Sequence, residues 1–330
     1  MTGGPRHLLD VDEWSDEWIA AVLDNASRAR DAGERHGNEL LGCRVVLLFV
    51  EPSTRTRVSF EMAARGLSAE TYVVDPASSS MVKGETLVDT VRNLDALGAD
   101  MIVMRHHRAG AAWVAARYFG GAVVNAGDGW HAHPTQALLD LLTLRRALWR
   151  PGVEPADALR GHKIAIVGDL LHSRVARSNV WTLSRAGADV WVSGPDGWLL
   201  GYDKLSVRTT PDLDAALDGA SAVMGLRVQK ERMRGSSLSI GDYITRYQIT
   251  DERLARAAAG AFYLHPGPIN EGVEVTRSVA RGPRSLVLEQ VANGLAVRMA
   301  VLAMLAPSSP RGLRGPQADS AMRDFSKTTR

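Results

Sequence analysis

The chain has 330 residues, 45% of them hydrophobic, which is enough for two hydrophobic cores, so we expect two domains. Its 39 Lys and Arg face 37 Asp and Glu, and the net charge of +2 excludes a strong long-range field for nucleic acid. No uncharged apolar stretch approaches the roughly 18 residues of a membrane span and the N-terminus lacks a signal-peptide core, so we expect a cytoplasmic protein without a membrane partner.

Apolar, β-branched runs alternate with helical patterns in the first half of the chain, as in a parallel sheet covered by helices on both faces. Cys43, the single cysteine, opens the first run and is expected to be a small buried side chain, and no internal disulfide is possible. Strands are predicted at residues 44–50, 72–74, 101–105 and 122–125. A helix is predicted from Pro134 to the stop signal at residues 149–152, where we place a domain boundary.

The pattern then restarts as a second α/β unit. Strands are predicted at residues 163–167, 190–193, 222–226 and 262–265, with a helix at 175–183. The fold class is therefore α/β, with two doubly wound parallel-sheet domains at residues 1–150 and 151–306. The apolar helical pattern at 285–305 is too extensive for a surface helix and is expected to pack back across the domains. Residues 307–330, rich in Pro, Ser, Gly and Arg, are predicted to form a flexible tail.

Hydroxyl and guanidinium groups cluster directly after the first predicted strand, in the sequence Ser-Thr-Arg-Thr-Arg at residues 53–57. Apolar residues follow from Phe60 at i, i+3, i+4 and i+7, which predicts a helix that Ser53 or Thr54 caps. A helix start offers unpaired N–H groups and a positive dipole to a phosphate. These residues favour a phosphate-binding loop over the alternative, an ordinary capped helix with solvated arginines.

Histidines follow two of the later strands. His131 and His133 form a His-x-His pair, but their neighbours supply no third or fourth ligand, so we expect no metal. A neutral His133 that donates a hydrogen bond is favoured, because a helix N-terminus lowers histidine basicity. Arg105 and Arg108 flank two more histidines at a strand end, where α/β proteins bind ligands, although a solvated basic turn has the same composition.

Arg174 and Arg227 each stand just beyond a predicted strand of the second unit. Both can converge on one crevice and clamp carboxylates bidentately, whereas a structural salt bridge explains either one alone equally well. His-Pro-Gly-Pro at residues 265–268 holds backbone carbonyls rigidly at the same crevice or forms a simple turn. Gly168 follows a strand without a Gly-x-Gly-x-x-Gly motif, so an NAD-dependent oxidoreductase is disfavoured and no cofactor is expected.

Five motifs occur in a defined order and spacing: Ser-Thr-Arg-Thr-Arg, Arg-His, His-Pro-Thr-Gln, Arg-Val-Gln-Lys-Glu-Arg and His-Pro-Gly-Pro. They stand at residues 53–57, 105–106, 133–136, 227–232 and 265–268. Together they resemble the aspartate carbamoyltransferase catalytic chain of the aspartate/ornithine carbamoyltransferase superfamily, over about residues 8–305. The resemblance implies a carbamoyl-phosphate domain followed by an aspartate domain, with the last helix returning to the first domain.

The resemblance also implies a role for each motif. The phosphate of carbamoyl phosphate would be held by Ser53, Thr54, Arg55 and Thr56. The carbamoyl oxygen would be faced by Thr56, Arg105 and His133, and the carbamoyl amide by Gln136. The two carboxylates of aspartate would be bound by Arg174 and by Arg227 with Gln229, beside the crevice backbone at Gly267 and Pro268. A loop that reaches a neighbouring subunit's site in the family, and so implies a homotrimer, matches Ser79 and the aspartate-binding Lys83.

The implied reaction is attack of the aspartate amine on the carbamoyl carbon, through a tetrahedral oxyanion that expels phosphate. Its product, N-carbamoyl-L-aspartate, belongs to the second step of pyrimidine synthesis. The catalytic set is then Arg55, Thr56, Arg105 and His133, and a regulatory chain or a dihydroorotase is a candidate partner. The alternatives are a carbamoyltransferase with another amino-acid acceptor in specialised metabolism and a relative that binds its ligand without turnover.

The chain departs from the family pattern at four positions beside these motifs. The family usually has proline after Arg-His, where this chain has His107 and Arg108, and smaller or more polar residues in place of Trp130 and Ala132. The donor-binding set is complete, so the departures concern the rate or the exact acceptor more than the reaction class. Ornithine transcarbamylases carry His-Cys-Leu-Pro near residues 265–268 and lack Arg-Val-Gln-Lys-Glu-Arg, which disfavours ornithine.

Overall fold

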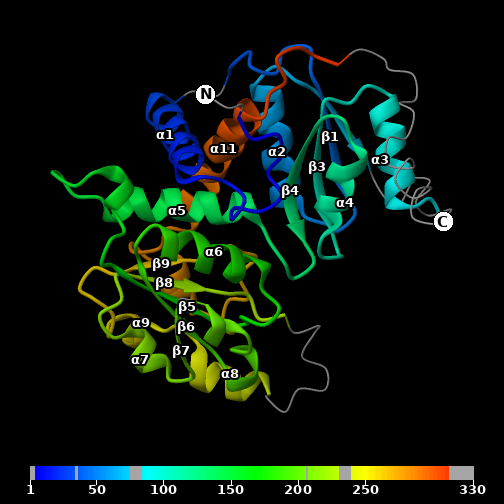
Figure 1. Ribbon diagram of the computed structural model, residues 1–330. Helices are drawn as coiled ribbons and strands as arrows, with labels where there is room; N and C mark the ends of the chain where they lie inside the picture. The colour runs from blue at the N-terminus through cyan, green and yellow to red at the C-terminus, as the bar shows by residue number, and fades with distance from the viewer. Residues whose placement is uncertain (1–3, 34–35, 75–83, 206, 230–238, 312–330) are drawn as a thin grey trace, which may run out of the picture.

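The computed structural model describes residues 4–33, 36–74, 84–205, 207–229 and 239–311. Two parallel β-sheets lie one beyond the other along the molecule, and helices flank each of them (Figure 1). In both sheets the strand order reverses once. The predicted fold class, two doubly wound α/β units, is confirmed.

The first sheet has the strand order β2-β1-β3-β4, and all neighbouring strands are parallel. Its strands are β1 (Arg44–Phe49), β2 (Glu70–Val74), β3 (Met101–His106) and β4 (Ala122–Asp128). They are connected by α2 (Thr54–Gly66), α3 (Leu87–Ala96) and α4 (Ala111–Tyr118). The order reverses between β1 and β3, which is the point where open α/β sheets bind ligands.

The apolar run of β1 is continuous because both faces of the strand are covered. Val45 and Leu47 belong to the large core that contains residues of α1 (Asp16–Ala32), α5 (Pro134–Leu148) and α11 (Val287–Met304), whereas Val46 and Leu48 belong to a second core with residues of α4. Successive side chains of a strand point to opposite faces, so burial of both faces requires an apolar residue at every position. Cys43, just before β1, is buried as predicted.

The second sheet has the strand order β7-β6-β5-β8-β9, again fully parallel, and reverses between β5 and β8. Its strands are β5 (Lys163–Val167), β6 (Asp189–Ser193), β7 (Arg208–Thr210), β8 (Ala222–Gly225) and β9 (Phe262–Leu264). The helices of this unit are α6 (Arg174–Arg185), α7 (Leu213–Leu217), α8 (Ile240–Tyr247), α9 (Asp251–Leu254) and α10 (Arg277–Ala280). Short 3-10 turns occur at Pro155–Asp157, Asp196–Trp198 and Tyr202–Lys204.

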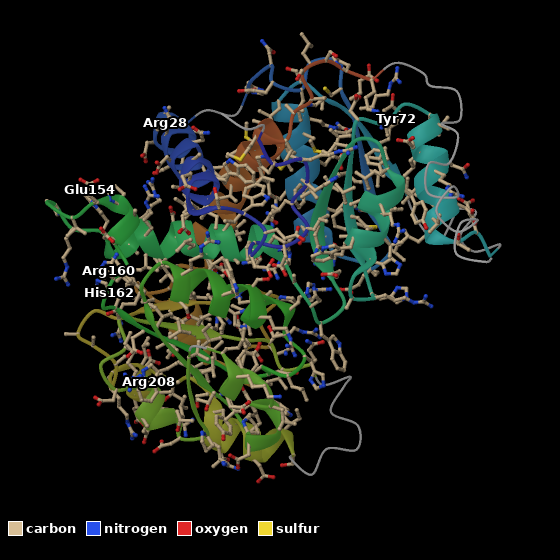
Figure 2. All side chains as sticks on the ribbon, in the orientation of Figure 1. Arg28, Tyr72, Glu154, Arg160, His162 and Arg208 are labelled. Carbon is tan, nitrogen blue, oxygen red and sulfur yellow. The ribbon has the colours of Figure 1, made fainter. Side chains whose placement is uncertain are left out.

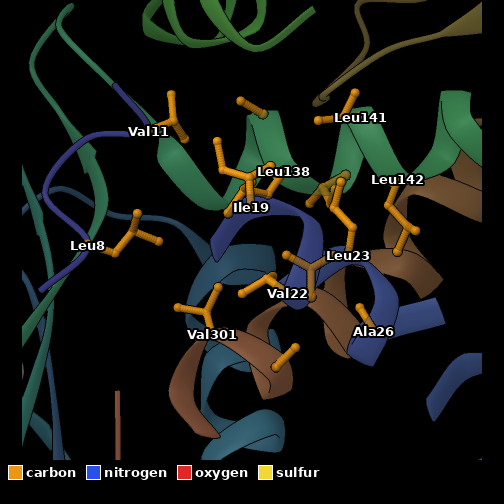
Figure 3. Close-up of a cluster of buried hydrophobic side chains, with 14 of the residues drawn as sticks. Leu8, Val11, Ile19, Val22, Leu23, Ala26, Leu138, Leu141, Leu142 and Val301 are labelled. Atoms are coloured by element: carbon orange, nitrogen blue, oxygen red, sulfur yellow. The ribbon is translucent and has the colours of Figure 1, made fainter. Parts of the chain in front are cut away.

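Three further helices join the two sheets, namely α1 (Asp16–Ala32), α5 (Pro134–Leu148) and α11 (Val287–Met304). Helix α5 runs between the sheets and packs on α6 (Figure 1). Helix α11 follows the second sheet in the chain but returns to the first unit, where it packs against α1, α2 and α5. Figure 3 shows Leu23, Leu142 and Val301 in the core that these helices share. The prediction that the last helix packs back across the domains is confirmed.

Helix α11 is long and apolar enough to cross a membrane by its length and composition. It is 56% buried inside the protein, where α1, α2 and α5 cover it. Its apolar residues are therefore explained by packing inside the protein, and α11 is a core helix.

Most predicted strands agree closely with the structure, and two differences have a local cause. Strand β4 continues past residue 125 to Asp128, because its pairing with β3 shifts register between Met104 and His106. The edge strand β7 was not predicted, because Arg208 and Thr209 are exposed and leave no apolar run to detect.

Residues 307–311 were predicted as the start of a flexible tail, but Arg311 is held in place. Its Nη2 pairs with Asp95 Oδ1 at 2.8 Å, and its Nη1 donates to the carbonyl of Ala99 at 2.9 Å. The side chain is 7% exposed, so these contacts shield it from solvent. The predicted tail therefore does not begin at residue 307, and residues 312–330 lie outside the described part of the chain.

Leu302→Ala is expected to lower the free energy of unfolding by about 2–5 kcal/mol, because this side chain of α11 is fully buried and its loss leaves a cavity. Equilibrium urea unfolding measures the change. Leu288→Ala is the matched control, since that leucine lies on the same helix and is 82% exposed, and its effect should stay within about 0.5 kcal/mol. Equal losses in the two variants would contradict the packing of α11.

Candidate active site

A cavity of about 1190 Å³ lies where the two sheets face each other. Its wall is formed by residues that follow strands β1, β5, β8 and β9, by Arg105 of β3, and by the starts of α2, α5 and α6 together with α11. The predicted site residues that line it are Ser53, Thr54, Arg55, Thr56, Arg105, His133, Gln136, Arg174, Arg227, Gln229, Gly267 and Pro268. The two other predicted residues, Ser79 and Lys83, lie outside the described residues.

The start of α2 forms one end of this wall. Ser53 is the N-cap residue, but its side chain makes no capping hydrogen bond, and no acidic residue stands in the first turn. The N–H groups of the first turn and the nearby hydroxyls are therefore not occupied by a capping carboxylate or hydroxyl. The expectation of an ordinary side-chain cap is wrong, and the arrangement suits an anion, which a helix N-terminus favours electrostatically.

The loop after β9 approaches the α2 end of the wall closely. Gly267 has φ +66, a left-handed conformation, and a Cβ atom placed on it would overlap the guanidinium of Arg55. The left-handed backbone is the main reason for glycine here, because the guanidinium that a Cβ would meet is the far end of a flexible side chain and can shift. Residues 265–268 line the cavity next to Arg55.

Glu51 connects arginines from the two sheets. It accepts from Arg105 Nη2 at 2.8 Å and from Arg174 Nη1 at 3.1 Å, and it also pairs with Arg174 Nη2. Burial acts to raise the pKa of Glu51, but Arg174 and Arg105 outweigh burial and lower the pKa, so the carboxylate is ionised. Sequence analysis did not identify Glu51, although an acidic residue directly before a basic loop is a usable signal.

Arg105 keeps its charge in this buried position. Burial, followed by the charge of Arg174, lowers its pKa to about 10, and Glu51 opposes the shift. Arg105 is therefore a cation at neutral pH. Gly127, with φ +115, lies next to both Arg174 and Arg105 and leaves room for the two guanidiniums.

His133 is the N-cap residue of α5, and its backbone N–H donates to Ser178 Oγ at 3.0 Å. Burial first, and then the charges of Arg105 and Arg174, hold its pKa well below the usual range. The imidazole is neutral, as expected, but the main cause is burial among arginines from other elements. A neutral ring donates a hydrogen bond without adding another charge to the cavity.

The other histidine of the His-x-His pair points elsewhere. His131 Nδ1 lies 3.4 Å from Asp128 Oδ1, and its Nε2 lies 3.6 Å from Asp10 Oδ2. Histidines two residues apart therefore have different partners. Within the described ranges, no group of three or more His, Cys, Asp or Glu residues is placed to hold a metal.

The second sheet contributes the far end of the cavity. Arg174 is the first residue of α6, and Gln229 Nε2 donates to the carbonyl of His172 at 3.0 Å. His172, which also lines the cavity, is held by the buried Asp169, with Nδ1 2.8 Å from Oδ1. Trp130 packs edge-on against His172, with ring centroids 4.7 Å apart. Sequence analysis did not identify His172, whose partners become visible only in three dimensions.

The departures from the family pattern lie outside this wall. His107 stacks on His106 at a ring distance of 4.3 Å, and Arg108 N donates to His106 Nδ1 at 2.9 Å. His107, Arg108 and Trp130 do not line the cavity. Their contacts are with neighbouring side chains, so they leave the cavity wall complete.

The wall carries an excess of positive charge. Its arginines are Arg30, Arg55, Arg105, Arg174, Arg227 and Arg298, and Glu51 is the one carboxylate among the described residues of the wall. Charged side chains elsewhere, such as Arg28, Glu154 and Arg208, stand exposed on the outside of the molecule (Figure 2). The concentration of arginines between the sheets therefore matches a site for more than one anionic group.

Arg298 is a further cation that sequence analysis did not identify. It lies on the core helix α11, and its Nη1 donates to Ser59 Oγ at 2.7 Å. Burial lowers its pKa to about 10, while Asp140 acts in the opposite direction. The one arginine of a mostly apolar helix was the available signal, since an unpaired charge is rarely buried in a core.

Known proteins are similar to this chain in sequence over most of its length. The family model of the aspartate/ornithine carbamoyltransferase carbamoyl-P binding domain matches residues 6–146, and that of the Asp/Orn binding domain matches residues 160–305. The chain is 48% identical over 307 residues to the aspartate carbamoyltransferase catalytic subunit of Roseiflexus sp. (strain RS-1), covering 90% of this chain and 94% of that protein. It is 48% identical over 300 residues to the corresponding subunit of Thermus aquaticus, with coverages of 90% and 97%.

Solved structures of enzymes named for aspartate and of enzymes named for ornithine share the fold of this chain. Aspartate transcarbamoylase from Trypanosoma cruzi, in complex with N-(phosphonacetyl)-L-aspartic acid, has a TM-score of 0.78 and 30% identity, covering 92% of this chain and 97% of that chain. Ornithine carbamoyltransferase from Pyrococcus furiosus has a TM-score of 0.80 and 27% identity, with coverages of 93% and 98%. The backbone alone therefore does not select the acceptor, and the choice depends on side chains.

Gly267→Ala is expected to raise the Kd for inorganic phosphate about tenfold, because the added Cβ displaces the Arg55 guanidinium from the cavity. Isothermal titration calorimetry measures the change. Gly197→Ala is the control, since a Cβ at that glycine meets open space and its φ is not positive. An unchanged Kd in folded Gly267→Ala would remove the loop from phosphate binding.

Proposed function

The chain belongs to the aspartate/ornithine carbamoyltransferase family, and we propose that it is an aspartate carbamoyltransferase. It converts carbamoyl phosphate and L-aspartate to N-carbamoyl-L-aspartate and phosphate, the second step of de novo pyrimidine biosynthesis. The observation that carries the proposal is the single cavity in which the start of α2 faces Arg174, Arg227 and Gln229. One end suits a phosphate and the other end suits a dicarboxylate.

The donor binds at the α2 end. Ser53, Thr54, Arg55 and Thr56 hold the phosphate, and the carbamoyl oxygen then lies toward Thr56, Arg105 and His133. Gln136 binds the carbamoyl amide. A Trypanosoma cruzi relative of this fold has been solved with carbamoyl aspartate and phosphate, which supports placing both products in one site.

The reaction needs only groups that these residues supply. The aspartate amine forms a bond to the carbamoyl carbon, and the carbonyl electrons move onto oxygen. The cations Arg55 and Arg105, the hydroxyl of Thr56 and neutral His133 stabilise this developing oxyanion. The C–O bond to phosphate then breaks, the phosphate leaves toward Arg55, and a phosphate oxygen accepts the proton of the amine.

The acceptor end favours a dicarboxylate over a diamine acid. Arg174 holds one carboxylate of aspartate, and Arg227 with Gln229 holds the other, with Lys83 of a neighbouring subunit added. An incoming carboxylate competes with Glu51 for Arg174. The ammonium group of ornithine would instead face arginines, because Glu51 is already paired with two of them.

The remaining organisation follows the same assignment. Residues 1–150 form the carbamoyl-phosphate domain, and residues 151–306 form the aspartate domain, whose final helix returns to the first. The chain assembles as a cytoplasmic homotrimer in which Ser79 and Lys83 complete the neighbouring site. The family relationship and the curated relatives named as catalytic subunits support this organisation.

Purified protein with carbamoyl phosphate is expected to form a ureido product with aspartate and not with ornithine or putrescine. A colorimetric ureido assay measures the product.

Arg55→Ala should lower kcat/KM by about 10²–10³, because it removes a charge that stabilises the transition state. Arg57→Ala, an exposed arginine two residues on that does not line the cavity, is the control. Turnover with ornithine or putrescine but not with aspartate would overturn the acceptor assignment.

Mixing two inactive variants tests the shared site. Arg55→Ala and Lys83→Gln trimers, dissociated and reassembled together, are expected to recover about a quarter of wild-type activity, because one intact site forms in each mixed trimer. Each variant treated alone is the control. No recovery in mixtures that light scattering shows to be trimeric would contradict a site shared between subunits.

A further inference from the structure

A buried carboxylate lies directly behind the carbamoyl end of the cavity. Asp140 stands on α5 one turn after Gln136, and it is 0% exposed. Its Oδ1 accepts from Gln136 Nε2 at 2.9 Å and from Gln290 Nε2 at 2.7 Å, and its Oδ2 accepts from Asn179 Nδ2 at 2.8 Å. The three amides come from α5, α11 and α6, so one carboxylate connects the helices that surround the cavity.

The carboxylate determines which way each amide faces. An ionised carboxylate only accepts hydrogen bonds, so each neighbouring amide must turn its NH₂ group toward Asp140. The oxygen of Gln136 is then directed away from Asp140, and Gln136 lines the cavity. In the part of the chain that the structure describes, no protein group donates to this oxygen. Gln136 therefore offers the cavity an acceptor.

This orientation distinguishes two donors of the same shape. A carbamoyl group carries an NH₂ with two N–H donors, whereas an acetyl group carries a methyl group in its place. Resting on the function proposed above, we propose that Asp140 is a specificity-determining positioning residue. It holds the oxygen of Gln136 toward the donor and so selects carbamoyl phosphate over acyl phosphates such as acetyl phosphate.

The same carboxylate also orders the opposite wall. Gln290 turns its NH₂ group to Asp140, and its Oε1 accepts from the backbone N–H of His265 at 2.9 Å. His265 begins the loop that contains Gly267, which touches the Arg55 side of the site. A leucine at position 140 has nearly the shape of aspartate but no acceptor oxygen, so it frees the Gln136 amide to turn round. An asparagine is less decisive, because its oxygen in the place of Oδ1 still accepts from Gln136 and Gln290, and only Asn179 must turn.

A purely structural tie between helices is the competing explanation. Burial raises the pKa of Asp140 to about 6, against the lowering effect of the three amides and Arg298. The Asp140 carboxylate is therefore mainly ionised at neutral pH. An apolar residue would join the three helices without the free-energy cost of burying a charge. Two needs explain a carboxylate there and a structural tie does not: a group that only accepts hydrogen bonds from the amides, and a negative charge near Arg298.

The test compares two stable ligands, phosphonoacetamide and acetonylphosphonate, which differ in NH₂ against CH₃. Calorimetry at pH 8, where Asp140 is ionised, should give the wild type at least about a tenfold preference for the amide. In Asp140→Leu the preference should fall to about one, which is a larger change than that in the Kd for inorganic phosphate. Asp140→Ala, which also removes the carboxylate, provides the same readout if the leucine variant does not fold.

Thr143→Ala is the matched control for loss of a buried link between α5 and α11. Thr143 is 1% exposed and accepts from Asn293 Nδ2 at 2.9 Å, without contact to Gln136. Its ligand preference should equal that of the wild type, whereas Gln136→Leu should abolish the preference.

Three outcomes overturn the inference. The first is an unchanged preference in Asp140→Leu when Gln136→Leu loses it, and the second is an equal loss in Thr143→Ala. The third is a wild type that forms carbamoyl aspartate but binds both ligands equally. All three leave the proposed function standing. Absence of carbamoyl transfer in the wild type would instead remove the proposed function, so the two failures are distinguishable.

Discussion

The rest of this structure depends on one constraint, which is that several positively charged side chains are confined in one cavity. Six arginines share the wall of one cavity with a single described carboxylate, in a chain whose net charge is only +2. Burial lowers the pKa of Arg105 and of Arg298, so the charged forms of these arginines are less favourable in the cavity than in water. Glu51 offsets part of the repulsion from within the wall, and Asp140 does so from behind it. The remaining positive charge makes the cavity a favourable place for two anions.

The fold meets this constraint by combining two crevices. Each sheet reverses its strand order once, and each reversal leaves a crevice at the carboxyl ends of its strands. Helices α5 and α11 hold the two sheets so that these crevices face each other, and Glu51 joins Arg105 of the first sheet to Arg174 of α6 in the second unit. The proposed phosphate site of one unit and the proposed carboxylate site of the other thereby share one cavity.

Charge alone does not select a carbamoyl group, so neutral groups complete the site. His133 is kept neutral by burial and by the surrounding arginines, so its ring can donate a hydrogen bond without adding to the repulsion. Gln136 supplies an acceptor whose direction depends on Asp140. Charged groups nearby thus determine the neutral state of His133 and the direction of the Gln136 amide. This dependence links the specificity of the cavity to its electrostatics.

Local sequence patterns by themselves determined the order of the strands and helices and the residues at the phosphate end of the cavity. These features depend on residues that are neighbours in sequence, namely apolar runs, a helix start and the hydroxyls and guanidiniums of residues 53–57. Local patterns therefore predict them directly. Only the tertiary structure decided the partners of these residues. Glu51 meets Arg174 across 123 positions, and Asp140 meets Gln290 across 150, so no local window contains either pair. The neutrality of His133 and the direction of the Gln136 amide depend on such partners, because pKa and hydrogen-bond direction are properties of surroundings that distant segments supply.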